Sequence, residues 1–266
     1  MPKYNSLKHS DNQLESESES SNSNVPNGFN GQYEFNIKEI LKRAYLLSTQ
    51  NNWTLLLGLL CIFAITFVIY FIYLDAFEIT DFSLLMTENS PLTQGQQAII
   101  ELTLTVVLAP LWTGVTMLAI STNRGVSQSA LNIFEFYKII PALALASCLV
   151  SIFFTMGIAL FFIPGFYIFT VTTFTLPLIA DKKLGPISAI IFSIRMSNVY
   201  LWKMLQLYLI FLLMLFVVIL SFGFAYFWIG PLYFNAKAIL YDDLFRNSLA
   251  KSDDERANMN KGVFNA

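Results

Sequence analysis

Charged residues are scarce in this chain, and their scarcity excludes most classes of soluble protein. Only 13% of the 266 residues are Asp, Glu, Lys or Arg, against about 25% in soluble domains. The charges gather in a few segments and leave long uncharged runs between them. Segments that cross hydrocarbon must be helices or closed barrels, because an unpaired backbone amide there costs several kcal/mol. These runs do not alternate polar with apolar residues as barrel strands do, so they predict an all-α integral membrane protein.

Histidine and cysteine are nearly absent, which excludes several kinds of chemistry. The single histidine, His9, lies in the polar N-terminal stretch, so Ser-His-Asp, Cys-His and H-E-x-x-H arrangements are missing. Cys61 and Cys148 lie within apolar runs, where we interpret them as small packing residues rather than disulfide or metal ligands. No Walker or G-x-G-x-x-G loop is present. We therefore expect no catalytic residue, no metal and no cofactor, and we do not expect an enzyme.

Apolar residues are also rare at the two ends of the chain. Residues 1–33 are rich in Ser, Asn and Glu and cannot bury enough apolar surface to offset the entropy of ordering, which predicts a disordered cytoplasmic tail. No cleavable signal peptide is visible in this polar start. Residues 248–266 predict a second polar tail, so we expect the membrane domain over residues 34–247.

Long apolar runs are what the chain has in abundance, since 55% of its residues are hydrophobic. About 20 apolar residues in a helix cross the hydrocarbon core of a bilayer. The runs predict six transmembrane helices, at about residues 53–74, 98–121, 139–160, 164–181, 202–222 and 224–244.

The basic residues predict the orientation of these spans. With six spans, all 16 Lys and Arg fall on one side or at the helix ends of that side. The connections at 75–96, 161–165 and 222–225 have none, and the first of them is acidic. The positive-inside rule then places both termini in the cytoplasm. The net charge of −2 gives no basis for nucleic-acid binding.

An amphipathic stretch before the first span suggests an internal repeat. Residues 36–50 place apolar side chains on one helical face and cations on the other, as a helix at the headgroup boundary does. Aligning Ile37, Ser127 and Pro186 brings three such surface helices into register, each followed by two spans. The second, fourth and sixth spans also each contain a proline: Pro110, Pro177 and Pro231.

The most distinctive stretch is IPGFYIFTVTTFTLPLIADKKLGPISAIIFSIRMSN, residues 163–198. We interpret its Pro-Gly pair as a tight turn that opens the fourth span, and its Gly185-Pro186 pair as the start of a surface helix. This stretch resembles the signature of the YciC-like inner-membrane proteins of bacteria, and the likeness extends over roughly 102–198. The matching positions are Pro164, Gly165, Pro177, Asp181, Lys182, Gly185, Ala189 and Ser193. The resemblance implies a six-span inner-membrane protein and supplies no catalytic residue.

Ionisable residues within the spans are the remaining functional candidates. Lys237 lies about ten residues past an aromatic belt, roughly 15 Å along a helix. It could be a buried cation near Asn235 that pairs with Asp181 or binds an anionic headgroup, or it could extend to the cytoplasmic interface. Glu101 could be a proton-coupling carboxylate or an interfacial acid near a helix N-terminus.

Threonines and prolines leave similar alternatives open. Thr170, Thr172, Thr173 and Thr175 could line a polar path through the fourth span, or they could serve helix packing. The three span prolines could mark broken helices around a substrate site, or they could be packing kinks.

Two functional hypotheses follow from the sequence. The first is a non-enzymatic protein that supports envelope integrity or membrane-protein assembly, with lipids and other inner-membrane proteins as partners. The second is a transporter or lipid-handling protein with a cavity between its helices. A tightly packed bundle favours the first, and a wet internal cavity that reaches Lys237 favours the second.

Overall fold

The described part of the chain is helical, which confirms the all-α fold class. The computed structural model describes residues 35–50, 52–79, 92–126 and 128–246, and no strand occurs within them. Apart from the last turn, Asp242–Arg246, the helices described below belong to one structural unit, Phe35–Asp242. The predicted tails 1–33 and 248–266, and residues 80–91 of the acidic connection, lie outside the described residues.

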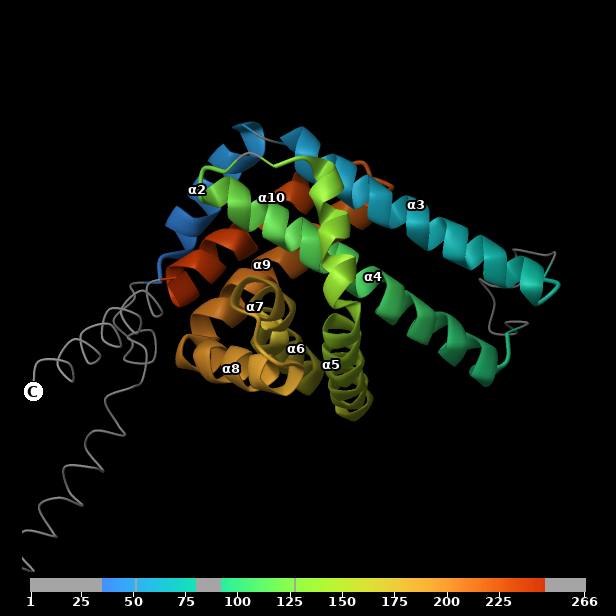
Figure 1. Ribbon diagram of the computed structural model, residues 1–266. Helices are drawn as coiled ribbons and strands as arrows, with labels where there is room; N and C mark the ends of the chain where they lie inside the picture. The colour runs from blue at the N-terminus through green and yellow to red at the C-terminus, as the bar shows by residue number, and fades with distance from the viewer. Residues whose placement is uncertain (1–34, 51, 80–91, 127, 247–266) are drawn as a thin grey trace, which may run out of the picture. The chain divides into compact units, whose positions relative to one another are not determined.

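The elements follow the chain in the order drawn in Figure 1. They are α2 (Ile37–Gln50), α3 (Asn52–Ala76), α4 (Gln94–Asn123), the 3-10 helix η3 (Ala130–Ile139), α5 (Ile140–Leu160), α6 (Phe162–Thr172), α7 (Thr175–Lys182), α8 (Pro186–Val199), α9 (Leu201–Leu220), α10 (Tyr226–Tyr241) and the π-helical turn η4 (Asp242–Arg246).

Five helical segments of the described residues are long and apolar enough to cross a membrane. They are Trp53–Ala76, Gln94–Asn123, Ala130–Leu160, Phe162–Lys182 and Leu201–Leu220. At the place of the sixth predicted span, α10 has 16 residues. At about 1.5 Å per residue it is roughly 24 Å long, which is shorter than the hydrocarbon core of about 30 Å.

The helices divide into an inner and an outer set. Buried side chains are concentrated on α4, α6, α7 and α10, the inner helices, where Leu111, Leu178 and Ala236 are fully buried. The outer helices, α3, α5 and α9, present large apolar side chains to the outside, and Phe67 and Leu220 are 69% and 80% exposed. Such apolar surface is unfavourable in water and is compatible with a surrounding of lipid.

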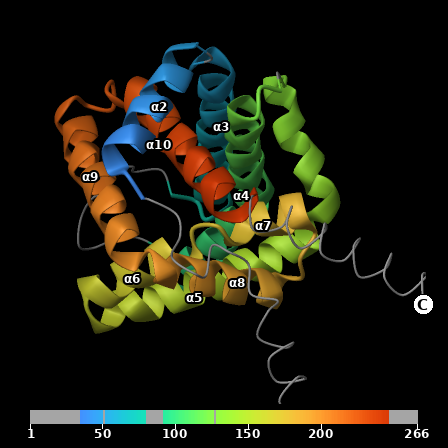
Figure 2. The same ribbon diagram turned by 90° about the vertical axis from the view of Figure 1, so that its left-hand side faces the viewer.

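The amphipathic helix α2 has a capped N-terminus and one buried face. The Asn36 side chain accepts a hydrogen bond from the Glu39 amide at 3.4 Å, so Asn36 caps the N-terminus of the helix. Its buried side chains, Ile40, Ala44 and Ser48, recur every fourth residue and therefore lie on one face. That face packs against α10, and Figure 2 shows α10 running between α2 and α4.

The fourth predicted span consists of two helices, and both of its prolines lie in first turns. Helix α6 begins at Phe162, so the turn lies at Phe161, whose backbone is extended, and not at Pro164-Gly165. A proline is well tolerated in a first turn, where its missing amide proton would have no partner. Pro177 is likewise in the first turn of α7. Its ring cannot accommodate a helical carbonyl four residues earlier, which explains the break at Thr173–Phe174.

Candidate functional site

A cavity of about 540 Å³ lies between the inner helices and α5. Helix α4 contributes Leu108, Trp112 and Thr116, and α5 contributes Ser147 and Ser151. The walls from α6, α7, the break between these two helices, and α10 include Phe169, Thr173, Thr175, Tyr233 and Lys237. Cavities of roughly 300–1,000 Å³ with apolar walls and a few polar groups are typical small-molecule sites.

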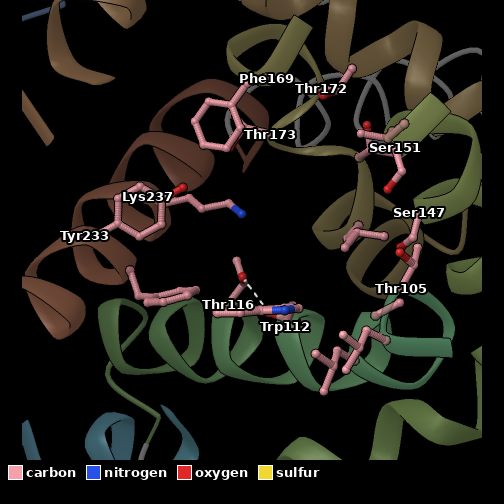
Figure 3. Close-up of a pocket in the computed structure, with 17 residues that line it drawn as sticks. Thr105, Trp112, Thr116, Ser147, Ser151, Phe169, Thr172, Thr173, Tyr233 and Lys237 are labelled. Carbon is pink, nitrogen blue, oxygen red and sulfur yellow. Dashed lines mark hydrogen bonds between the residues drawn. The ribbon is translucent and has the colours of Figure 1, made fainter. Parts of the chain in front are cut away.

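Lys237 brings the one positive charge among the residues that line this cavity. Figure 3 shows its amino group pointing into the open centre, with Phe169 and Thr173 on one side and Trp112 and Thr116 on the other. In the part of the chain that the structure describes, the amino group has no hydrogen bond or ion pair. An ammonium group in a site of mainly apolar lining requires a compensating negative or polar partner.

Two hydroxyl groups in the cavity wall also lack partners. Ser147 Oγ of α5 and Thr175 Oγ1 of α7 are buried and have no hydrogen-bond partner among the described residues. Thr175 is 1% exposed. A buried hydroxyl without a partner costs about 1–3 kcal/mol, so these groups are available to a molecule that enters the cavity.

The threonines of the fourth span serve both of the roles considered for them. Thr172, Thr173 and Thr175 line the cavity, whereas Thr170 does not. Thr170 and Thr172 donate hydrogen bonds to the carbonyls of Phe166 and Ile168 one turn earlier, at 2.8 and 2.7 Å. The Thr173 hydroxyl bonds to the Tyr208 hydroxyl of α9 at 3.1 Å.

Asn235 does not share a site with Lys237. It lies two residues earlier on α10, and its Nδ2 donates to Ser48 Oγ of α2 at 2.9 Å. Ser48 Oγ in turn donates to the Ala44 carbonyl at 2.8 Å. Asn235 is fully buried, and among the described residues its Oδ1 has no partner. It therefore joins α10 to α2, on a different face of α10 from the cavity.

Glu101 lines a second cavity, of about 340 Å³, between α4 and α5. Thr105 of α4 and Ser151 of α5 border both cavities. The remaining wall of the second cavity is mainly apolar and includes Leu102, Ile152 and Met156. The two cavities thus adjoin along the line where α4 faces α5.

A cluster of charges joins the C-terminal ends of three inner helices, and we call it the Arg124 cluster. Arg124, just after α4, forms two ion pairs: Nη1 lies 3.0 Å from Asp181 Oδ1 of α7, and Nη2 lies 2.8 Å from Asp242 Oδ1 after α10. The Asn123 amide donates to Asp242 Oδ2 at 2.7 Å, and the Tyr241 hydroxyl donates to Asp181 Oδ2 at 2.9 Å. The C-terminal ends of α4, α7 and α10 are thus joined to one another by ion pairs and hydrogen bonds.

The electrostatics of the Arg124 cluster keep its central cation charged. Burial alone would lower the pKa of the Arg124 guanidinium, but the hydrogen bonds with Asp181 and Asp242 outweigh burial and raise that pKa. The Asp242 side chain is only 5% exposed. Because Asp181 is occupied by Arg124, Tyr241 and Lys182, the pair of Asp181 with Lys237 that the sequence suggested is not formed.

The positions of the YciC-like motif have structural roles around these sites. Asp181 and Lys182 form an ion pair at 3.3 Å. Gly185 precedes α8 as its N-cap residue. Ala189 and Ser193 of α8 are fully buried, and Ser193 Oγ donates to the Val171 carbonyl of α6 at 2.7 Å. Of the motif residues, only Asp181 and Lys182 belong to the Arg124 cluster, and none lines the cavity.

Comparison with known proteins finds no matching family model, no matching curated protein and no matching solved structure. The resemblance to the YciC-like proteins therefore rests on the motif residues alone.

Sequence reasoning missed the Arg124 cluster and most of the cavity wall. Arg124 and Asp242 are 118 residues apart in the chain, and each lies at the end of an apolar run, where an interfacial charge is the simplest interpretation. The signal that could have found the cluster is that the second, fourth and sixth apolar runs each end at an ionisable residue.

Proposed function

We propose that this chain is an integral membrane protein that binds an anionic amphiphile in the cavity around Lys237, as a transporter or a lipid-handling protein. The observation that carries this proposal is the Lys237 amino group, which points into a cavity of about 540 Å³ without a protein partner among the described residues. A bound anion would supply the missing charge.

The cavity is the reason to prefer this function to a purely structural one. A protein that only supports the envelope or assembles other proteins gains nothing from an unpaired cation inside its bundle, and such residues within membrane segments are costly. The free hydroxyls of Ser147 and Thr175 add hydrogen-bond donors to the same cavity.

The proposal includes a topology. We propose six spans in a bacterial inner membrane, with α10 as the sixth and both termini in the cytoplasm, because the basic residues fall on one side of that arrangement. Lys237 would then lie in the cytoplasmic half of the membrane.

Purification in a mild detergent, followed by native mass spectrometry, tests the binding function. We expect an anionic molecule to co-purify with the wild-type protein and to be lost from the variant Lys237→Met. Lys203→Met is the matched control, since Lys203 is exposed on α9 and lines no cavity described above. The same anionic molecule in all three preparations, or in none of them, would contradict the proposal.

A further inference from the structure

We propose that the ligand is a single-chain, singly headed anionic amphiphile, whose head binds Lys237 and whose acyl chain lies along the groove between α4 and α5. This inference rests on the proposed function and specifies its ligand. The groove is formed by the two adjoining cavities and runs from Thr116 to Glu101 on α4.

The residues of α4 that line the groove fall on one side of the helix. Glu101, Thr105, Leu108, Trp112 and Thr116 follow one another at intervals of three or four residues, which is the spacing of a helix face. At about 1.5 Å per residue, the rise along α4 from Leu102 to Trp112 is roughly 15 Å. One acyl chain covers about the same length, because two opposed leaflets make a hydrocarbon core of about 30 Å.

The short border between the two cavities favours one chain over two. Where the two cavities meet, they share only Thr105 and Ser151, one residue from each helix. Beyond that neck the wall is mainly apolar, with Leu102, Ile152 and Met156. An apolar chain gains about 0.8 kcal/mol for each CH₂ group that leaves water, but it gains little on transfer from lipid. Recognition must therefore come from the head.

The charges at the two ends of the groove set the orientation of the ligand. Lys237 lies in the first cavity and Glu101 in the second, and no other Asp, Glu, Lys or Arg lines either. About 22 Å of α4 separates Glu101 from Thr116, which lies across the cavity from Lys237 (Figure 3). An anionic head is attracted at the Lys237 end and repelled at the Glu101 end, so the chain must point toward Glu101. Carboxylate and phosphate heads share this chemistry.

Photolabelling of the full-length protein tests the position of the ligand. The protein is placed in nanodiscs of phosphatidylcholine and exposed to palmitate that carries a diazirine either near the carboxylate or at the chain end. We expect the chain-end probe to label peptides of α4 before Thr105 and of α5 after Cys148, and the head-end probe to label α10. Lys237→Met should reduce both signals at least tenfold.

A second variant separates the chain from the head. Thr105→Phe fills the neck and should reduce chain-end labelling of the second cavity at least tenfold, while Lys237 is unchanged. Leu145→Phe is the matched control, since Leu145 is 52% exposed on α5 and lines neither cavity; it should label as the wild type does. Chain-end labelling on the outward faces of α3 or α9 would overturn the inference. So would labelling that is equally strong in the wild type and in Lys237→Met.

Competition against the palmitate probe distinguishes the heads and the number of chains. Unlabelled palmitate and palmitoyl lysophosphatidate should compete, and the tighter of the two identifies the carboxylate or the phosphate head. Two-chain phosphatidate should compete at least tenfold more weakly. If phosphatidate competes equally and depends on Lys237, the single-chain inference fails while the proposed function stands. If no anionic lipid binding depends on Lys237, both fail.

Discussion

At the scale of single residues, two serines on α8 show how one hydroxyl can stabilise the fold and another cannot. Ser193 and Ser197 are both fully buried. Ser193 Oγ donates to the Val171 carbonyl of α6 at 2.7 Å, whereas Ser197 Oγ has no partner among the described residues. The net free energy of a buried hydrogen bond is about 1 kcal/mol, and a buried hydroxyl without a partner costs about 1–3 kcal/mol.

The two serines therefore predict opposite responses to the same substitution. Ser193→Ala should lower the stability of the purified protein by about 1 kcal/mol, because it leaves the Val171 carbonyl without its donor. Ser197→Ala should leave stability unchanged or raise it. Thermal unfolding followed by tryptophan fluorescence in one detergent measures both, and equal losses in the two variants would be inconsistent with the hydrogen bond described above.

At the scale of elements, the contact between α5 and α6 depends on two glycines. A Cβ atom on Gly157 would lie 2.9 Å from the Gly165 Cα and 2.7 Å from the Ile168 Cδ1. A Cβ atom on Gly165 would meet mainly the flexible end of Ile158. Small residues that let helix backbones approach are a common device in membrane bundles, and here they set the separation of the α5–α6 hairpin.

Alanine at Gly157 should force these two helices apart. We expect Gly157→Ala to destabilise the protein, because overpacking costs about 1–3 kcal/mol and exceeds the gain in helix propensity of up to about 1 kcal/mol. Gly95→Ala is the control, since nothing lies within 4 Å of a Cβ atom there. The temperature of unfolding should fall for Gly157→Ala alone, and a rise for both variants would refute the close contact.

The elements differ in how far the sequence could predict them. Apolar length predicts helices such as α3 and α9, because a lipid-facing helix needs little beyond uniform hydrophobicity. It does not predict the break between α6 and α7, since Pro177 is equally compatible with a kink in one span. Nor does it predict the packing of α2, whose apolar face is covered by α10 through contacts far apart in the chain.

The candidate site was predictable only in part, for the same reason. The sequence singled out Lys237 by its depth in an apolar run, and the structure places that lysine in the wall of a cavity. It grouped Asn235 and Glu101 with Lys237 as polar residues within spans, but helix rotation points Asn235 toward Ser48 and distance puts Glu101 in another cavity. Facing directions of helices depend on tertiary packing, which a single sequence does not encode in an obvious pattern.

At the scale of the whole molecule, the topology can be tested with single cysteines in the full-length chain. In a background where Cys61 and Cys148 are replaced by Ala, we introduce Ser21→Cys, Ser90→Cys or Ser252→Cys. If both termini are cytoplasmic, a maleimide that cannot cross membranes should label only Ser90→Cys in intact spheroplasts. The other two should react only after lysis. Labelling of Ser252→Cys from outside would instead indicate five spans.

The Arg124 cluster has a consequence for how the proposed ligand would enter and leave the cavity. It fastens three inner helices at one end of the cavity, about one helical turn beyond Lys237, since Tyr241 follows Lys237 by four residues on α10. Departure at that end would require two carboxylates to be released from one guanidinium at the same moment. Departure sideways, between α4 and α5, breaks no ion pair of the cluster. The proposed ligand should therefore enter and leave sideways, between α4 and α5, directly from and into the lipid.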